Sequence, residues 1–290
     1  MSDVHDTAAE LPQALPPAPP TVPVARPIAL AYEADWRRRL HPFLLPDLSP
    51  KAAWADIAIA AVLLVALEIS AAMVFGALLA TSGAAPADGD LPPQLQQELL
   101  VPGLTVRLAE VALVVGLILR ARRQPVAAVG ITARGWAVDI GIGTVALVVA
   151  YGTLALTVFL AWLLWPELIR QLQENSDRLL DLVPPLGPVA FIPVALLIGS
   201  TEELLFRGFL MSRLRRATGS WFVAVLLSTV LFTVLHAAEQ TNAALLIVAV
   251  LSIIFSLLTV WRRSILPAIV AHALFDYSQF VLLHSARISN

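Results

Sequence analysis

Residues 187–212 have the sequence GPVAFIPVALLIGSTEELLFRGFLMS, an apolar stretch interrupted by two adjacent glutamates and an arginine. A helix needs about 20 mainly apolar residues to cross a bilayer, so this stretch is long enough to span one. Each ionisable group at the centre of such a helix costs about 2.5–3.5 kcal/mol on insertion scales. Glu202, Glu203 and Arg207 are therefore the first candidates for a function inside the membrane.

The same apolar pattern recurs along the chain beyond Lys51. Of the 290 residues, 58% are hydrophobic and only 14% are charged, whereas a soluble globular protein carries about 25% charged residues. The predicted fold class is all-α, a polytopic transmembrane helix bundle of about seven spans. The spans are predicted at 54–80, 102–119, 136–165, 187–212, 220–237, 242–261 and 265–284.

Charge balance and cysteine content exclude several other classes of protein. Lys and Arg number 19 against 21 Asp and Glu, a net charge of −2, so we expect no nucleic-acid partner. The sequence contains no cysteine, which excludes disulfides, thiolate metal ligands and cysteine nucleophiles. The first partner that we expect is the lipid bilayer.

The first fifty residues differ from the rest, because they hold ten of the 21 prolines. Proline cannot donate to a helix ladder, so residues 15–27 are predicted to be extended or disordered, most simply as a tether. Tyr32–Leu45 is predicted to form a short amphipathic helix on the membrane surface. The domains expected are 1–50, a disordered Pro-rich cytoplasmic tail with that interfacial helix; 51–186, the first three transmembrane helices; and 187–290, a four-helix core.

Basic residues occur in alternate loops between the predicted spans, so nearly all of them lie on one side of the membrane. The opposite side carries only Arg170, Arg178 and Arg287 among many acidic residues. The positive-inside rule therefore predicts a cytoplasmic N-terminus and an outside C-terminus. Arginine outnumbers lysine 18 to 1, which is typical of a GC-rich bacterial genome, so a bacterial plasma membrane is expected. The residues on the basic side are Arg37, Arg38, Arg39, Lys51, Arg120, Arg122, Arg123, Arg134, Arg213, Arg215, Arg216, Arg262 and Arg263.

Four ionisable residues of the first three spans have structural explanations. Arg107 and Glu110 are three residues apart, so they share a helix face and are predicted to neutralise each other. Asp139 lies in the first turn of its helix, where the macrodipole stabilises an anion. Glu68 has no local partner, and two alternatives stay open: an ion pair with Arg107 across helices, or a place in a polar cavity.

The last four predicted spans carry the remaining ionisable groups. Glu203 and Arg207 are four residues apart and suit a buried ion pair, whereas Glu202 points about 100° away and needs another partner. The next span contains FTVLH at 232–236 and the last contains HALFD at 272–276, so His272 and Asp276 share one face. A single histidine in a span is often a packing residue, but these groups recur together within 75 residues.

Carboxylates and imidazoles that converge in a water-filled pocket are the groups that hydrolysis requires. A base must take a proton from water, and donors must stabilise the oxyanion. Counting about 1.5 Å per residue from the predicted cytoplasmic ends, His272 lies about 12 Å deep, Glu202 about 15 Å and His236 about 24 Å. For a common site, the helix that carries His236 must be tilted, shifted or begin later than Ser220.

These three segments resemble the signature of the CAAX protease and bacteriocin-processing (CPBP, or Abi) family, which includes the eukaryotic Ras-converting enzyme. The family pattern is Glu-Glu-x-x-x-Arg, Phe-x-x-x-His and His-x-x-x-Asn/Asp on successive helices. The resemblance covers residues 187–280, where the motifs stand as Glu202-Glu203-Leu-Leu-Phe-Arg207, Phe232-Thr-Val-Leu-His236 and His272-Ala-Leu-Phe-Asp276. It implies that 187–290 is a catalytic core of the CPBP/Abi type.

The resemblance also implies an activity, an intramembrane endopeptidase that cleaves a membrane-associated peptide or protein. Glu202 would be the base that activates water, with His236 also holding that water. His272 and Asp276 would stabilise the oxyanion, and Glu203 with Arg207 would brace the site. The Ras-converting enzyme has asparagine where Asp276 stands, so this aspartate acts as an oxyanion donor only if it is protonated or orients His272.

Cofactor use is left with two alternatives. The metal-free mechanism is favoured, and zinc is the alternative, with Glu202, His236 and His272 as its ligands; the spacing of these residues does not separate the two.

Two other functions stay open: a catalytically inactive immunity or scaffold membrane protein, and a proton-coupled transporter. The transporter would use Glu68, Glu202 and Glu203 as a proton relay.

Overall fold

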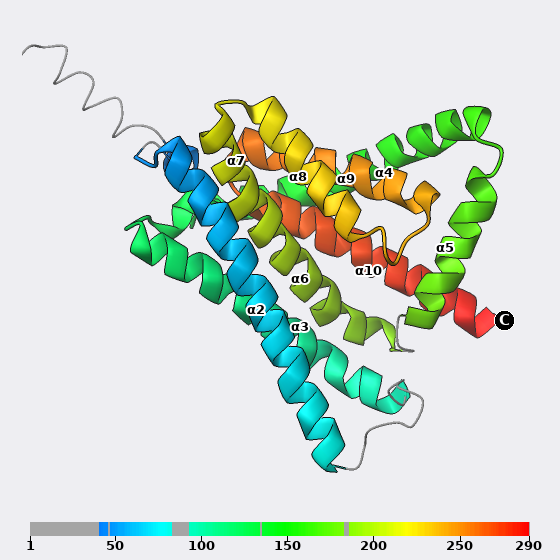
Figure 1. Cartoon of the computed structure of the whole chain (residues 1–290). Coiled ribbons are helices and arrows are strands. Elements are labelled where there is room, and N and C mark those ends of the chain that lie inside the picture. The colour runs from blue at the N-terminus through cyan, green and yellow to red at the C-terminus, as the bar shows by residue number, and fades with distance from the viewer. Residues whose placement is uncertain (1–40, 46, 83–92, 134, 183–185, 290) are drawn as a thin grey trace, which may run out of the picture. The chain divides into compact units, whose positions relative to one another are not determined.

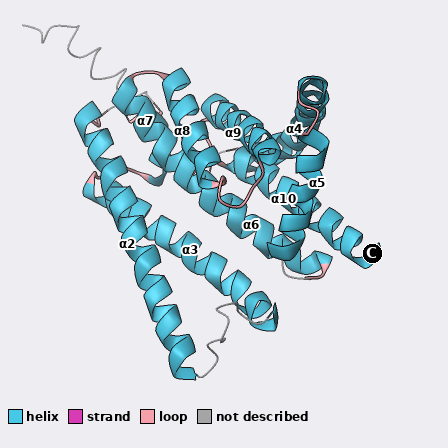
Figure 2. Ribbon diagram, turned by 45° about the vertical axis from the view of Figure 1, so that its right-hand side comes forward, coloured by secondary structure: helices cyan, strands magenta, loops and turns pink. Residues whose placement is uncertain are grey.

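The structure is a computed structural model that describes residues 41–45, 47–82, 93–133, 135–182 and 186–289 (Figure 1). Over these residues the chain is helical, with connecting loops and no strand (Figure 2). The predicted all-α class is therefore confirmed. The α-helices are α2 (Pro50–Ser82), α3 (Pro93–Ala121), α4 (Trp136–Leu164), α5 (Leu168–Leu182), α6 (Phe191–Glu202), α7 (Met211–Thr218), α8 (Trp221–Leu235), α9 (Asn242–Arg262) and α10 (Leu266–Ser289).

Six segments of the described chain are helical, long and apolar enough to cross a membrane. A seventh, α8, is apolar but has only 15 residues, which is about 22 Å of helix against a hydrocarbon core of about 30 Å. The predicted polytopic bundle is confirmed, with its fifth span shorter than expected. The six segments are Pro50–Thr81, Glu98–Ala121, Trp136–Leu164, Pro188–Thr218, Asn242–Arg262 and Leu266–Ile288.

The fourth of these segments is one continuous helical path made of four parts. After the 3₁₀ turn η3 (Pro188–Ala190) and α6, the path widens into a π-helix, η4 (Glu203–Leu210), and then tightens again into α7. Such widened turns are rare and occur often at functional sites. This one begins at the second glutamate of the predicted motif.

Small residues bring the neighbouring helices close to this path. A Cβ atom at Gly199 would lie 3.2 Å from the main-chain nitrogen of Ala273, so α6 and α10 touch backbone to backbone. A Cβ atom at Gly208 would lie 2.7 Å from the carbonyl oxygen of Val129, in the 3₁₀ turn η2 (Val126–Val129). Close approach through small residues is the usual way in which transmembrane helices pack. Here it brings the diacidic motif beside α10.

The predicted depth mismatch of His236 does not occur, because the motif path ends later than predicted and α10 begins beside Gly208 instead of at the end of the bundle. α8 begins at Trp221 with Ser220 as its N-cap, as expected, and places His236 about 22 Å along. The motif path continues to Thr218, where Gly219 with φ 77° ends it. Glu202 is therefore 16 residues from that end (218 minus 202), or about 24 Å.

His272 reaches the same level because α10 begins partway along the motif path. The Ile265 N–H donates to the Gly130 carbonyl, next to the turn that touches Gly208. α10 therefore starts beside Gly208, about 15 Å along the path from Thr218, and six further residues add about 9 Å to reach His272. Glu202, His236 and His272 lie at one level without displacement of α8.

α5 is a helix that the sequence did not predict, since 166–186 was taken as a loop between spans. It is amphipathic, with Leu168 and Asn175 buried and several charged residues exposed. A search for long apolar runs does not detect such a short polar helix. It packs against α4, α9 and α10.

The arginine-bearing ends of the helices gather at one end of the bundle. Arg122 Nη2 lies 2.7 Å from Oδ1 of Asp56, and Arg213 Nη2 donates to Oε1 of Gln124 at 2.9 Å. Asp56 is buried, although it was not among the intramembrane ionisable residues recognised in the sequence. These contacts bring the basic ends that carry Arg122 and Arg213 together, whereas Arg37, Arg38, Arg39 and Arg134 lie outside the described residues. The assignment of that end to the cytoplasm stays a prediction.

Two predicted explanations of intramembrane charges need correction. Arg107 Nε lies 2.8 Å from Oε1 of Glu68, so it pairs across α2 and α3 rather than with Glu110. This confirms one of the two alternatives for Glu68. Asp139 is more than an anion at a helix start, because Arg262 donates to its Oδ1 at 2.8 Å and 3.0 Å.

The predicted surface helix Tyr32–Leu45 falls mostly outside the described residues, as does the Pro-rich segment before it. Its described part is a 3₁₀ turn, η1 (Pro42–Leu44), rather than an α-helix. Phe43 in this turn is fully buried and stacks on Trp221 at 5.8 Å between ring centroids. This end of the segment is packed into the protein, because its one large aromatic residue has a partner there.

Candidate active site

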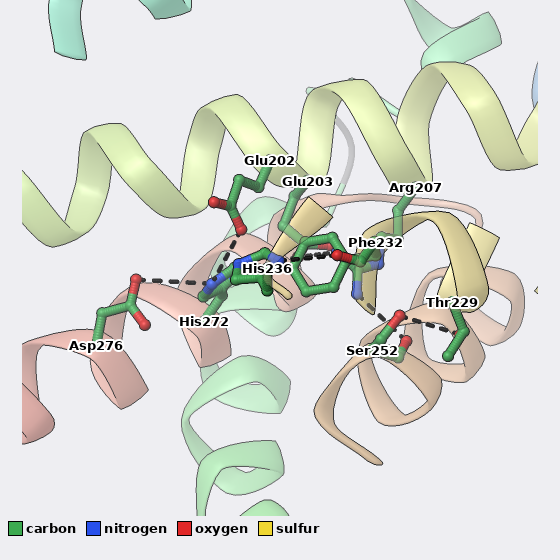
Figure 3. Close-up of polar contacts among 9 residues, drawn as sticks. All are labelled: Glu202, Glu203, Arg207, Thr229, Phe232, His236, Ser252, His272 and Asp276. Atoms are coloured by element: carbon green, nitrogen blue, oxygen red, sulfur yellow. Dashed lines mark hydrogen bonds and ion pairs between the residues drawn. The ribbon is translucent and has the colours of Figure 1, made fainter. Parts of the chain in front are cut away.

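The imidazole of His272 is the centre of the polar cluster in the bundle (Figure 3). Its Nδ1 atom lies 2.9 Å from Oε1 of Glu203. Its Nε2 atom lies 3.6 Å from Oε2 of Glu202 and 3.6 Å from Oδ2 of Asp276. One histidine on α10 thus faces both glutamates of the motif helix and the aspartate one turn further along its own helix.

Glu203 and Arg207 form the buried ion pair that the four-residue spacing predicts. Arg207 Nη1 donates to Oε1 of Glu203 at 2.8 Å, and both side chains are 0% exposed. A buried ion pair is tolerated when further hydrogen bonds satisfy its atoms. Arg207 Nη2 also donates to the Ser252 carbonyl at 3.3 Å, which ties the pair to α9.

Aromatic rings enclose the guanidinium and the imidazole. The Arg207 guanidinium carbon lies 4.5 Å from the centroid of the Phe232 ring and 5.8 Å from that of Phe255. The Phe255 ring also stacks on His272 at 5.2 Å. These contacts from α8 and α9 exclude water on one side of the cluster and favour the cation through the ring faces.

The partners of His272 decide which of its nitrogens carries a proton toward Glu203. An ionised carboxylate only accepts hydrogen bonds, and Glu203 is the ion-pair partner of Arg207. The Nδ1–H group of His272 therefore donates to Glu203. This arrangement fixes the plane of the ring and directs Nε2 toward Glu202 and Asp276.

The carboxylates on the Nε2 side are the accessible part of the cluster. The side chains of Glu202 and Asp276 are 26% and 17% exposed, whereas that of Glu203 is fully buried. The 3.6 Å distances to Nε2 are longer than a direct hydrogen bond. Glu202 is the most exposed acid of the cluster, so it is the one most able to reach a water molecule and a substrate.

His236 joins the cluster through Phe232 rather than through a direct polar contact with the acids. It is the C-cap residue of α8, and its Nδ1 atom lies 2.8 Å from the Phe232 carbonyl oxygen. A carbonyl only accepts, so Nδ1 carries the proton and Nε2 presents a lone pair. The Phe232 ring lies 4.5 Å from the His236 ring and 6.5 Å from the His272 ring.

The predicted zinc ligands do not form a metal site in this arrangement. Among the described residues, no three His, Cys, Asp or Glu side chains are grouped so that they could hold a metal ion. The Nδ1 atoms of His236 and His272 contact a carbonyl and a carboxylate, and each Nε2 atom points away from these partners. Zinc use therefore stays a prediction.

The polar residues of α9 beside the ion pair were not predicted from the sequence. Ser252 is fully buried, and its hydroxyl donates to Oγ1 of Thr229 on α8 at 3.0 Å. Ser256 and Thr259 are also buried on the same helix. Hydroxyl residues spaced by three or four positions in an otherwise apolar span are a signal that could have found this face.

The fold and the site together define a polytopic helical membrane protein with an acid–imidazole cluster inside its bundle. Residues 184–278 match a family model described as type II CAAX prenyl endopeptidase Rce1-like. The matched segment contains all three motifs, so the family resemblance seen in the sequence is confirmed. No curated protein and no solved structure matched the chain. The match supports a membrane protease of the CAAX endopeptidase type.

Proposed function

We propose that this protein is an intramembrane endopeptidase in which Glu202 activates the water that cleaves a membrane-associated peptide or protein. The observation that carries the proposal is the position of His272. Its Nδ1 is held by Glu203, and its Nε2 faces the more exposed carboxylates Glu202 and Asp276. A base and a fixed donor therefore stand side by side on neighbouring helices.

The proposed reaction needs one proton acceptor, one oxyanion donor and one proton return. Glu202 takes a proton from water as the water oxygen attacks the carbonyl carbon of the scissile peptide bond. His272 acts as an imidazolium in this proposal: its Nδ1–H donates to Glu203, and its Nε2–H donates to the oxygen that becomes negative in the tetrahedral intermediate. Glu202 then gives the proton to the leaving amine nitrogen as the C–N bond breaks.

The remaining site residues have supporting roles in this proposal. His236 accepts a hydrogen bond from the attacking water through the lone pair on Nε2. Asp276 orients His272 from the Nε2 side, which explains how an aspartate can stand where the eukaryotic relative has asparagine. Glu203 and Arg207 hold the ring of His272 from the Nδ1 side.

The ion pairs support this function over a proton relay. Glu68 is paired with Arg107, and Glu203 is paired with Arg207. Two of the three glutamates of the proposed relay therefore have a local arginine partner. A hydrolase uses the third, Glu202, and needs no path across the bilayer.

The substrate class follows from the position of the site and from the family match. Glu202 and His272 lie about 24 Å along the helices from the turn at Thr218, inside the bundle. A substrate must therefore enter from the membrane or its surface. The matched family is described by its action on CAAX prenyl proteins, so a prenylated CAAX peptide is the first probe.

The test uses purified protein in detergent micelles and three quenched fluorescent peptides. They are a prenylated CAAX peptide, the same peptide without its prenyl group, and a peptide with one transmembrane segment. We expect cleavage of at least one by the wild-type protein and a loss of more than about 100-fold in Glu202→Gln, which keeps the shape but cannot accept the proton. Glu110→Gln, a matched glutamate outside the cluster, should behave as wild type. The proposal fails if no peptide is cleaved or if Glu202→Gln cleaves at the wild-type rate.

A further inference from the structure

His236 lies at a helix end, so the segment that follows it controls where its main chain sits. α8 stops at Leu235, and residues 236–241 lead to α9. The N–H groups of Glu239 and Gln240 both donate to the His236 carbonyl, at 3.2 Å and 3.1 Å. The loop therefore folds back on His236, and the position of Gln240 is coupled to that of the histidine.

Asn175 of α5 contacts this loop with both ends of its side-chain amide. Its Oδ1 atom accepts the Thr241 N–H at 3.0 Å, and its Nδ2 atom donates to Oε1 of Gln240 at 3.3 Å. Asn175 is only 7% exposed. A buried amide must have partners for its donor and its acceptor, and the loop supplies both.

Gln171, one turn earlier on α5, extends the same contact to the start of α9. Its main-chain oxygen accepts the Thr241 hydroxyl at 3.0 Å, and its Oε1 atom accepts the Ala243 N–H at 3.2 Å. The first N–H groups of a helix have no partner within the helix. α5 therefore fixes both the loop and the N-terminus of α9.

α5 is itself anchored to the helix that carries His272. The side chain of Arg287, at the end of α10, donates to the Leu180 carbonyl of α5. α5 also packs against α9 and α10. A connected path of contacts thus runs from α10 through α5 and the loop to His236.

We propose that Asn175 is a positioning residue for the reaction and sets the place of His236 through Gln240. The inference rests on the proposed function, because it assumes that His236 holds the attacking water. α8 holds His236 from the N-terminal side, through the His236 N–H bond to the Thr233 carbonyl and the Nδ1 contact with the Phe232 carbonyl. The two bonds of Asn175 hold the loop that closes on the His236 carbonyl from the other side.

The activity test compares Asn175→Ala with Ser176→Ala on the cleaved peptide of the panel above. Ser176 is exposed, and its hydroxyl donates to Leu172 of its own helix. We expect Asn175→Ala to lower kcat by about 10- to 100-fold with little change in KM, because a displaced catalytic group slows chemistry more than binding. Ser176→Ala should match the wild type. Equal kcat values for the two variants would overturn the inference.

A double-mutant cycle separates positioning from general destabilisation. If Asn175 acts through His236, Asn175→Ala should cost little further activity in a His236→Ala background. Full additivity of the two losses would overturn the inference. Gln240→Ala removes the bond from Asn175 to the Gln240 side chain without changing α5, so it should also lower kcat even if Asn175→Ala folds poorly.

Hydrogen exchange of the full-length protein tests the contact without an activity. Asn175→Ala should speed exchange of the Gln240 and Thr241 amides, while Ser176→Ala should not. Unchanged exchange in Asn175→Ala would overturn the inference. Wild-type cleavage by Glu202→Gln would instead overturn the proposed function, and the exchange result would still decide whether α5 holds the loop.

Discussion

The Nδ1 atom of His272 lies 2.9 Å from Oε1 of Glu203, although the two residues are 69 positions apart. The same carboxylate oxygen accepts from Arg207 at 2.8 Å. One fully buried carboxylate therefore links α10 to the π-helix of the motif and neutralises the guanidinium. Because one oxygen of Glu203 contacts both His272 and Arg207, Glu203 is a structural residue, and its role differs from that of its neighbour Glu202.

Glu203→Ala is expected to destabilise the protein as well as slow it. The substitution leaves Arg207 buried without its counter-ion, which costs on the order of 3–5 kcal/mol. Thermal unfolding in detergent micelles should show a clearly lower Tm and a lower yield of folded protein. Glu202→Gln, whose side chain is partly exposed, should keep the wild-type Tm. Normal stability with lost activity in Glu203→Ala would move this residue into the catalytic group.

Asp276→Asn is expected to retain substantial activity in the peptide cleavage assay, because it recreates the asparagine of the eukaryotic relative and can still orient His272.

His236→Ala and His272→Ala should each lose activity to a similar extent, since residues that act as a unit give non-additive losses. Peptide cleavage, bound metal and chelator sensitivity are measured on the same samples. A zinc mechanism is indicated if His272→Ala loses metal and activity together and a chelator inactivates the wild type.

Gly208→Ala is expected to disturb the site from a distance. The new Cβ atom would lie 2.7 Å from the Val129 carbonyl oxygen, a contact with main chain that cannot move aside easily. Gly116→Ala is the matched control, because nothing lies within 4 Å of a Cβ atom there and alanine favours a helix by about 1 kcal/mol over glycine. Thermal unfolding should show a lower Tm for Gly208→Ala and an unchanged or higher Tm for Gly116→Ala. The reverse order would mean that the turn η2 does not pack against Gly208.

The orientation in the membrane is expected to follow the basic residues. Reporter fusions after Arg123 and Arg216 should report the cytoplasm, and a fusion after Gln173 in α5 should report the exterior. The His236 loop would then lie nearer the exterior than Trp221 does. A reversed set of signals would contradict both the topology and the expected side of the Pro-rich segment.

The sequence alone was sufficient for features that depend on spacing within one helix. Apolar runs of about 20 residues predict spans because the thickness of the bilayer sets their length. The pairs Glu203–Arg207 and His272–Asp276 were predicted to face each other because residues four apart share a helix face. The structure has the first pair at 2.8 Å and the second at 3.6 Å.

The tertiary structure decided what lies between helices. Arg107 has two possible partners, Glu110 on its own helix and Glu68 on α2. Only the packing of α2 against α3 selects Glu68. The common level of Glu202, His236 and His272 likewise depends on where α10 begins, and the turn under Gly208 sets that point. α5 was not predicted because a search for long apolar runs does not detect a short polar helix, and the partner of its buried Asn175 lies on a loop 66 positions away. Sequence spacing encodes neighbours along one helix, whereas contacts between helices depend on crossing geometry that no local pattern contains.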